Sequence, residues 1–242
     1  MGCGGNSSAR PVQIPKNFTI HGNILDTQTR SMMAMCDVSG TKYILNNIEP
    51  LKGDNSATRY LAINPTGHIP MLEEGFFKVL GGNQLIYIFM VKNKPTIAEK
   101  LYPEDIEPKI KSIIGWHHAK MSTPGQQMFR AFCDSTAFPN PPTQQIVNKW
   151  KNDMVNNFGA LDKKLDKQTY LCGDRITIGD IVVYNELIMF NALLDISSSG
   201  AEYSGYSNLS KWMQTMAGDS HISALEADMK KQLTSVKRAI QG

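Results

Sequence analysis

The alternation of hydrophobic and polar positions divides the chain into two unlike parts. In the first part, FTIHGNI (18–24) and KYILNNI (42–48) are rich in β-branched and aromatic residues, which favours strands. Between them, residues 28–40 contain helix formers and end at a glycine, a common stop signal for a helix. The pattern therefore predicts a strand, a helix and a second strand.

A further helix, a hairpin and a third helix follow. Ser56 is a candidate N-cap for a helix that ends before the Asn-Pro pair at 64–65, because the residue before a proline disfavours the helical region. The runs IPMLEEG and FFKVL, separated by Glu-Glu-Gly, predict a β-hairpin. Gly81 and Gly82 then precede an apolar helix that begins near Asn83. Its free N–H groups can receive an anion, or the glycines form only a turn.

Beyond Lys94-Pro95 the strand signals disappear. The sequence ITIGDI contains a capping box, because the carboxylate of Asp180 can reach back to the N–H of Thr177 and so fix a helix start. This second part is predicted to be all-helical. Long helical patterns cover 104–134, 143–166, 178–194 and 208–240. The predicted organisation is a flexible tail (1–16), a small α/β domain (17–94) and an all-helical domain (95–242).

Composition and charge exclude several classes of protein. The 242 residues carry a net charge of +3, from 25 basic and 22 acidic residues, and no run of five like charges marks a nucleic-acid-binding surface. The four cysteines lie far apart without a CxxC pair or metal-ligand spacing with histidine, which favours a reducing compartment and no metal site. No apolar stretch reaches membrane-spanning length and no secretory signal is present, so we expect a cytoplasmic protein.

The first residues, MGCGGNSSARPVQ, suggest membrane attachment. Gly2 is a candidate for myristoylation and Cys3 for palmitoylation, and two acyl chains give stable anchoring. Asn6, however, stands where the acylation motif prefers Ser or Thr. The alternative is a disordered Gly/Ser tail.

Other chemically active side chains are interpreted as structural. His117 and His118 are adjacent on a helix and point about 100° apart, so they cannot chelate one metal from one face. Cys36 lies among methionines in the first helix, where a buried thiol is expected. His21 in the first strand is read as a packed residue, with a donor role as the alternative.

Four segments make the chain resemble the glutathione S-transferase superfamily, and theta-class members in particular. They are INPTGHIPML, IIGWHHAKM, YLCGDRITIGDI and YSNLSKW, in the family's order, and residues 18–240 can be followed through it. The resemblance implies a thioredoxin-like N-terminal domain, an all-helical C-terminal domain and a cis peptide at Ile69-Pro70. It also implies glutathione as substrate or ligand.

The resemblance places glutathione-binding positions at specific residues. The basic residue or histidine after the second strand corresponds to Asn55, and the backbone beside the cis-proline to His68 and Ile69. The acid-serine pair corresponds to Gly82 and Asn83, so the charge partner of the glutamyl amine is missing. Weak glutathione binding and a site no longer used are both open interpretations.

The resemblance also identifies the position that activates the thiol. The theta-type serine position holds Asp26, and Thr29 stands where a cysteine is common in the family. An ionised aspartate accepts hydrogen bonds and repels a thiolate, so it should raise the thiol pKa, and Asp26 is also a candidate helix cap. Thr27, one residue away, is a possible substitute donor.

These features predict a theta-like protein with weak or no conjugating activity that acts mainly through contacts with an unidentified protein partner. The alternative is a working transferase or peroxidase that joins glutathione to electrophiles. A homodimer is expected from the family, with the helix after Asn83 and the region of Trp116 supplying the surface. No nucleic-acid partner is expected.

Overall fold

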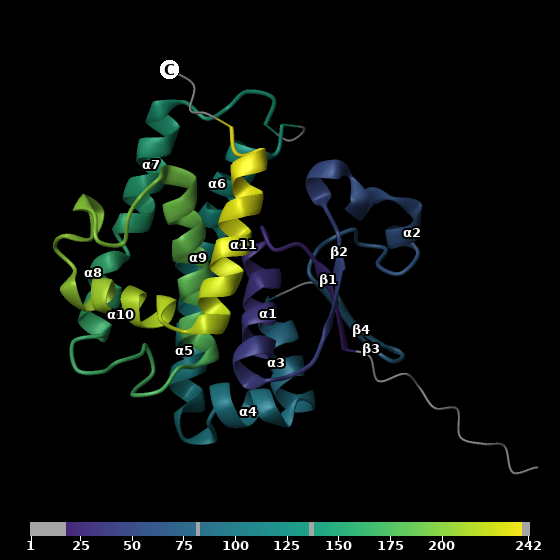
Figure 1. Ribbon diagram of the computed structural model, residues 1–242, viewed down its shortest axis with the longest axis horizontal. Coiled ribbons are helices and arrows are strands. Elements are labelled where there is room, and N and C mark those ends of the chain that lie inside the picture. The colour runs from purple at the N-terminus through teal and green to yellow at the C-terminus, as the bar shows by residue number, and fades with distance from the viewer. Residues whose placement is uncertain (1–17, 81–82, 136–137, 239–242) are drawn as a thin grey trace, which may run out of the picture.

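The computed structural model describes residues 18–80, 83–135 and 138–238, and Figure 1 shows a small sheet domain beside a larger helical domain. A four-stranded sheet has the strand order β2-β1-β3-β4. Strand β1 is parallel to β2 and antiparallel to β3, and β3 forms an antiparallel hairpin with β4. The four strands are β1 (Phe18–Gly22), β2 (Ile44–Asn47), β3 (Met71–Glu74) and β4 (Phe77–Leu80).

The two faces of the sheet are covered unequally, as Figure 1 shows. Ile20 and Leu72 belong to the main hydrophobic core, which continues through α1 and α3 into the helical domain. Met71 and Tyr60 belong to a small second cluster on the side of α2. The predicted fold, a thioredoxin-like domain followed by an all-helical one, is confirmed. Three helices belong to the sheet domain: α1 (Thr27–Ser39), α2 (Thr58–Leu61) and α3 (Asn83–Asn93).

The helical domain is built around α9, which is buried along almost its whole length. The predicted capping box is present, because Asp180 Oδ2 accepts from the N–H and the hydroxyl of Thr177 at 2.9 and 2.7 Å. Asp180 Oδ1 also accepts from the indole of Trp212 at 3.0 Å. The helices are α4 (Pro95–Leu101), α5 (Glu107–His117), α6 (Thr123–Cys133), α7 (Gln144–Val155), α8 (Phe158–Lys164), α9 (Ile178–Leu194), α10 (Ser207–Ala217) and α11 (Ser220–Val236).

Several predicted boundaries were wrong for local reasons. Ser56 lies in a 3-10 turn, and Ala57 precedes the short α2. The pattern over 104–134 contains two helices joined by a π-helical turn, η4 (His118–Ser122). The pattern over 208–240 is likewise two helices, because Asp219 caps a new helix with its carboxylate. Helix α4 was not predicted. The domain boundary itself stays a prediction.

Candidate functional site

The loop after β1 holds the residue expected to activate a thiol. Asp26 is the N-cap of α1, and its Oδ2 accepts from the N–H and the hydroxyl of Thr29 at 2.6 and 2.7 Å. The predicted capping role is therefore confirmed. The same contacts commit the hydroxyl of Thr29, which is buried, to the carboxylate of Asp26.

Burial raises the pKa of the Asp26 carboxyl to about 6, against the opposing hydrogen bonds from Thr29 and the charge of Arg30. At pH 7 the side chain is mostly ionised and accepts hydrogen bonds only. Thr27, the first residue of α1, is half-buried, and no hydrogen bond of its hydroxyl is found within the described residues. A hydrogen-bond donor to a bound thiol in this loop would therefore have to be the hydroxyl of Thr27 and not the carboxylate of Asp26.

The segment before β3 contains the predicted cis peptide, Ile69-Pro70. The carbonyl oxygen of His68 accepts from the Tyr60 hydroxyl at 2.9 Å and from Asn64 Nδ2 at 2.7 Å. Asn55 Nδ2 donates to the carbonyl of Gly67 at 3.0 Å. Asn55 thus stabilises the loop before the cis-proline. The side chain of His68 is exposed.

The main chain of Ile69 forms no hydrogen bond to any other residue that the structure describes. It is therefore available to an extended ligand. Because β1 and β3 are neighbours, with His21 opposite Met71, the loop that follows β1 and the peptide that precedes β3 lie at the same end of the sheet. The structure thus brings Asp26, Asn55, His68 and Ile69 to one end of the domain.

The third segment expected to bind glutathione, Gly82 and Asn83, is described only in part. Helix α3 begins at Asn83, as predicted, whereas Gly81 and Gly82 lie outside the described residues. Gly2 and Cys3 also lie outside them.

His21 is a packed strand histidine. Its Nε2 contacts Glu73 Oε2 at 2.9 Å, and its Nδ1 lies 2.8 Å from Asn46 Nδ2. Both ring nitrogens are thus engaged, and burial lowers the pKa of the imidazole although Glu73 opposes this. This arrangement favours the structural interpretation and leaves no free donor for a thiol.

The structural interpretations of Cys36 and of the pair His117 and His118 also agree with the structure. Cys36 is completely buried, and burial raises the pKa of its thiol far above the ordinary value. His117 is buried and its Nε2 lies 3.2 Å from Glu186 Oε2, while His118 is exposed. Within residues 18–80, 83–135 and 138–238, no three His, Cys, Asp or Glu side chains are grouped to hold a metal.

A buried interdomain contact escaped the sequence analysis. Arg30 in α1 donates from Nε to Asn185 Oδ1 at 2.8 Å and from its terminal nitrogens to the carbonyls of Asn185 and Ile24, both at 2.7 Å. Ile24 lies in the loop that leads to Asp26. The helical domain therefore holds this loop in place. Arg30 and Asn185 are 155 positions apart, so no local pattern pairs them.

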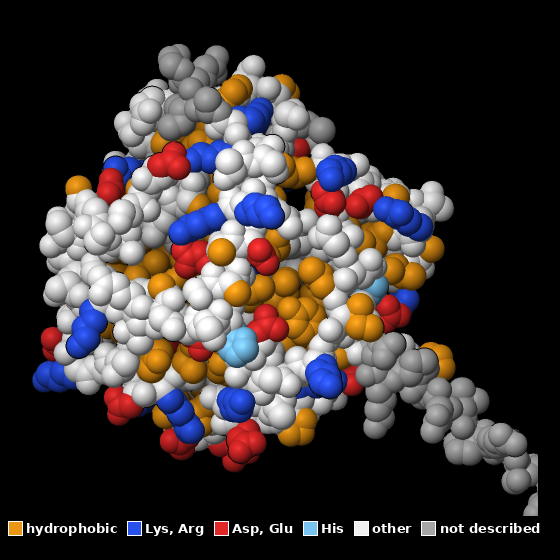
Figure 2. All heavy atoms as spheres, in the orientation of Figure 1, with side chains coloured by type: hydrophobic (Ala, Val, Ile, Leu, Met, Phe, Trp, Pro, Cys, Tyr) orange, Lys and Arg blue, Asp and Glu red, His pale blue; other side chains and the backbone are white. Residues whose placement is uncertain are grey.

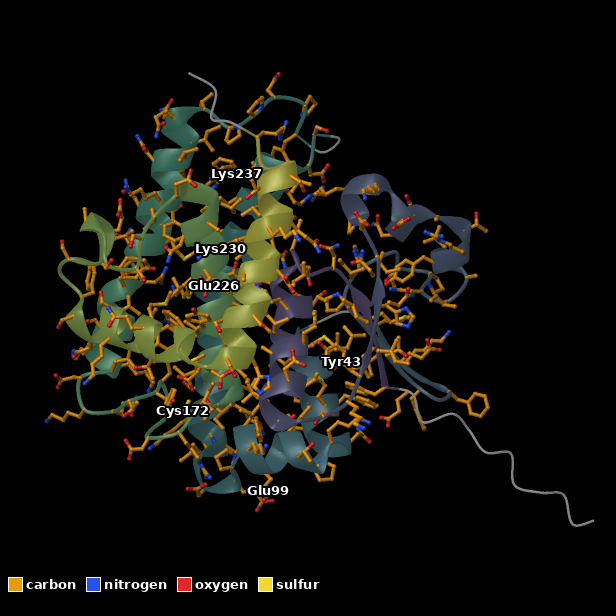
Figure 3. The ribbon with its side chains drawn as sticks, viewed as in Figure 1. Tyr43, Glu99, Cys172, Glu226, Lys230 and Lys237 are labelled. Carbon is orange, nitrogen blue, oxygen red and sulfur yellow. The ribbon has the colours of Figure 1, made fainter. Side chains whose placement is uncertain are left out.

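A separate pocket of about 680 Å³ lies among α9, α10, α11 and the turn after α9. Figure 3 shows Glu226, Lys230 and Lys237 along the side of α11 that faces α9. Glu226 accepts from the hydroxyl of Tyr184 and pairs with Lys230, both at 2.6 Å, while Lys237 pairs with Asp195 at 2.8 Å. These charges neutralise each other, and none of the expected glutathione-binding residues lines the pocket.

Comparison with known proteins gives one family. The model of the glutathione S-transferase C-terminal domain matches residues 127–219. Glutathione S-transferase theta-2 of Rattus norvegicus is 25% identical over 175 residues, 71% of this chain and 70% of the rat protein. The theta-3 protein of Mus musculus is 23% identical over 173 residues, 69% of this chain and 70% of the mouse protein.

Solved structures of the family share the fold. Human glutathione S-transferase T1-1 in its apo form superposes with a TM-score of 0.75 at 17% identity, covering 93% of this chain and 92% of the human one. A homolog from Drosophila mojavensis with bound glutathione gives a TM-score of 0.71 at 14% identity, covering 91% and 98%.

Proposed function

Because the chain belongs to the glutathione S-transferase superfamily and is theta-like, we propose that it binds glutathione weakly, has weak or no conjugating activity, and acts mainly through protein contacts in the cytoplasm. Asp26 carries this proposal. A transferase must stabilise the thiolate of glutathione, and a hydroxyl that donates to the sulfur does so. An ionised carboxylate at that position does the opposite.

The remaining contacts support weak binding. The main chain of Ile69 is available for an extended peptide, and a solved relative carries bound glutathione. The amide of Asn55 is hydrogen-bonded to Gly67 and adds no positive charge for a carboxylate of the ligand. With Gly82 at the acidic position, the charged ends of glutathione lack two partners that the family pattern provides.

The competing function is an active theta-like transferase or peroxidase, and the half-buried Thr27 favours it. Its hydroxyl is within one residue of Asp26 and is not committed to another described side chain. In this alternative Thr27 donates to the sulfur, and the bound thiol has a pKa below that of free glutathione.

Thiolate absorbance of bound glutathione, titrated against pH, separates the two functions. We expect a bound-thiol pKa at or above that of free glutathione in the wild type, and a lower one in Asp26→Ser. Asp26→Asn is the matched control, because asparagine keeps the helix cap and removes the charge without adding a hydroxyl. A depressed thiol pKa in the wild type that Thr27→Val abolishes would establish the active transferase instead.

Retention on immobilised glutathione and turnover of a general electrophile complete the test. The proposal predicts weak retention and turnover near the uncatalysed rate. Strong retention with rapid turnover would contradict it.

A further inference from the structure

The carboxylate of Asp26 has one committed oxygen and one free oxygen. The N–H and the hydroxyl of Thr29 both donate to Oδ2, at 2.6 and 2.7 Å. No hydrogen bond of Oδ1 is found within the described residues. In this part of the chain, the one fully buried side-chain oxygen or nitrogen without a partner is Glu186 Oε1, so Oδ1 of Asp26 is accessible to solvent. A ligand at this loop therefore meets a free acceptor.

The loop holds this acceptor in a fixed position. The carbonyl of Asn23 accepts from the N–H of Asp26, and the Asn23 side chain accepts from the N–H of Leu25, both at 2.9 Å. Nδ2 of Asn23 donates to Asn47 Oδ1 at 3.0 Å, which joins the loop to the end of β2. Because the cap of α1 also fixes Oδ2, the carboxylate keeps Oδ1 turned toward an incoming ligand.

No cation pairs with Oδ1 in the described part of the chain. Arg30 lies nearest in sequence, but its guanidinium donates to oxygens of Asn185 and Ile24. On the face shown in Figure 2, basic and acidic side chains are interspersed, so this face has no broad positive field that would stabilise an anion. A thiolate beside Oδ1 is repelled by the carboxylate, whereas a neutral thiol is not.

From this geometry we infer that Asp26 selects the free thiol of glutathione: the S–H group donates to Oδ1, and a thioether or a disulfide, which has no such donor, binds more weakly. The inference rests on the proposed function, because it takes the sulfur of weakly bound glutathione to lie at Asp26. A thiol is a weak donor, but an ionised acceptor strengthens the hydrogen bond. A ligand without the donor also displaces water from Oδ1 and leaves this oxygen unpaired, which is unfavourable.

This selectivity differs from what a transferase needs. A transferase gains rate by stabilising the developing thiolate, and an acceptor at the sulfur stabilises the protonated thiol instead. The protein then distinguishes reduced glutathione from its conjugates and its disulfide. Occupancy of the site follows the reduced form alone.

The selectivity should disappear in acid. Because burial raises the pKa of the Asp26 carboxyl to about 6, the group is mostly protonated at pH 5. The proton then lies on Oδ1, since Oδ2 keeps both donors of Thr29. The neutral carboxyl donates from Oδ1 to the sulfur of a thiol or of a thioether alike.

The charges around Asp26 come from two helices. Arg30 in α1 favours the ionised carboxylate, and Glu186 in α9 favours the neutral form. Tyr87 in α3 stays uncharged, because burial raises the pKa of its hydroxyl. The change between pH 7 and pH 5 is therefore assigned to Asp26.

The experiment measures dissociation constants by amide chemical-shift titration of the isotope-labelled full chain at pH 7. The ligands are glutathione, S-methylglutathione and the tripeptide in which aminobutyrate replaces cysteine, so that a methyl group stands in for the SH. Both analogues should bind the wild type roughly fivefold more weakly than glutathione, or weaker still. At pH 5, S-methylglutathione and glutathione should bind within about twofold of each other.

Asp26→Asn tests the cause. Asparagine keeps the helix cap with its carbonyl oxygen and turns its amide, a donor, toward the sulfur, so glutathione and S-methylglutathione should bind equally at pH 7. Asp219→Asn is the matched control, because it makes the same change at the cap of α11 and should keep the wild-type preference.

The outcomes separate this inference from the proposed function. Equal binding of glutathione and S-methylglutathione to the wild type at pH 7, or a preference that survives in Asp26→Asn, would overturn the inference and leave weak binding intact. A tripeptide that binds as tightly as glutathione would assign the difference to size and would overturn it too. Failure of all three ligands to bind would overturn the proposed weak binding as well.

Discussion

The guanidinium of Arg30 in α1 is completely buried and is held by the side-chain and main-chain oxygens of Asn185 in α9. Its third contact, to the carbonyl of Ile24, joins the helical domain to the loop that carries Asp26. Burial lowers the pKa of the Arg30 guanidinium to about 10, although nearby negative charges, that of Glu186 foremost, favour its charged form. The arginine is therefore both an interdomain contact and a support for the candidate site.

Removal of this contact should destabilise the protein strongly. Arg30→Met leaves the carbonyls of Ile24 and Asn185 without their donors and Glu186 without a neighbouring cation, and should lower the free energy of unfolding by about 3–5 kcal/mol. Asn185→Leu should cost less, because Arg30 keeps the main-chain oxygens. Urea denaturation measures both. A loss in Arg30→Met no greater than in the surface variant Arg59→Met would show that the contact contributes little.

Gly125 and Glu186 form a second close contact. A Cβ atom on residue 125 would overlap with Glu186 Oε1, and that oxygen is buried without a hydrogen-bond partner among the described residues. Gly125→Ala should therefore destabilise the fold by about 1–3 kcal/mol, although alanine is the better helix former. Gly115→Ala in α5, where a Cβ meets nothing within 4 Å, is the control and should be neutral or stabilising.

A double-mutant cycle tests the cause. If the clash with the carboxylate destabilises Gly125→Ala, then Glu186→Ala should remove most of that penalty when the two are combined. Additive effects of the two substitutions would contradict this explanation. Thermal unfolding of the wild type, the two single variants and the double variant gives the coupling free energy between the two positions.

The raised pKa of Asp26 has a defined effect on stability. Because the carboxyl titrates at about 6 in the folded state and near 3.8 in the unfolded chain, the folded protein binds the proton more tightly. The stability that this group contributes is complete below pH about 4 and falls as pH rises through about 6, by at most about 3 kcal/mol. The unfolding free energy of the wild type relative to Asp26→Asn should decrease over this window. A difference in unfolding free energy between the two proteins that does not change between pH about 4 and about 6 would mean that the pKa of Asp26 has its ordinary value.

Local signals explain which parts of the fold were predictable. The capping box of Thr177, the Glu-Glu-Gly hairpin and the helix cap at Asp26 each need only neighbouring residues, and all three are present. Helix α4 was missed because no helical pattern was assigned in the second part of the chain before residue 104, although Pro95 in the first turn favours a helix start. The division between α10 and α11 was missed because the cap at Asp219 lies inside a continuous apolar pattern.

The candidate site was predictable only as positions along the chain. The resemblance assigned site roles to Asp26, Asn55, His68 and Ile69, which the structure places at one end of the sheet; that they bind glutathione stays a prediction. It did not reveal that the side-chain amide of Asn55 donates a hydrogen bond to the carbonyl of Gly67. Such contacts depend on how a loop folds back on itself, and the motif spacing carries no information about them.

The final prediction concerns assembly. Ile88 lies on α3, the helix that we expect to face a second copy of the chain, and it is 39% exposed. Leu80 on β4, which packs beside α3, is also 39% exposed. A homodimer should sediment at twice the 26.9 kDa of the single chain. Ile88→Glu places a charge where the contact would exclude water, so it should shift the equilibrium toward the monomer. Ile146→Glu, on an exposed position of α7, should leave the dimer intact. A wild-type protein that sediments only near 26.9 kDa at micromolar concentration would refute the dimer, and an unchanged dimer in Ile88→Glu would move the interface away from α3.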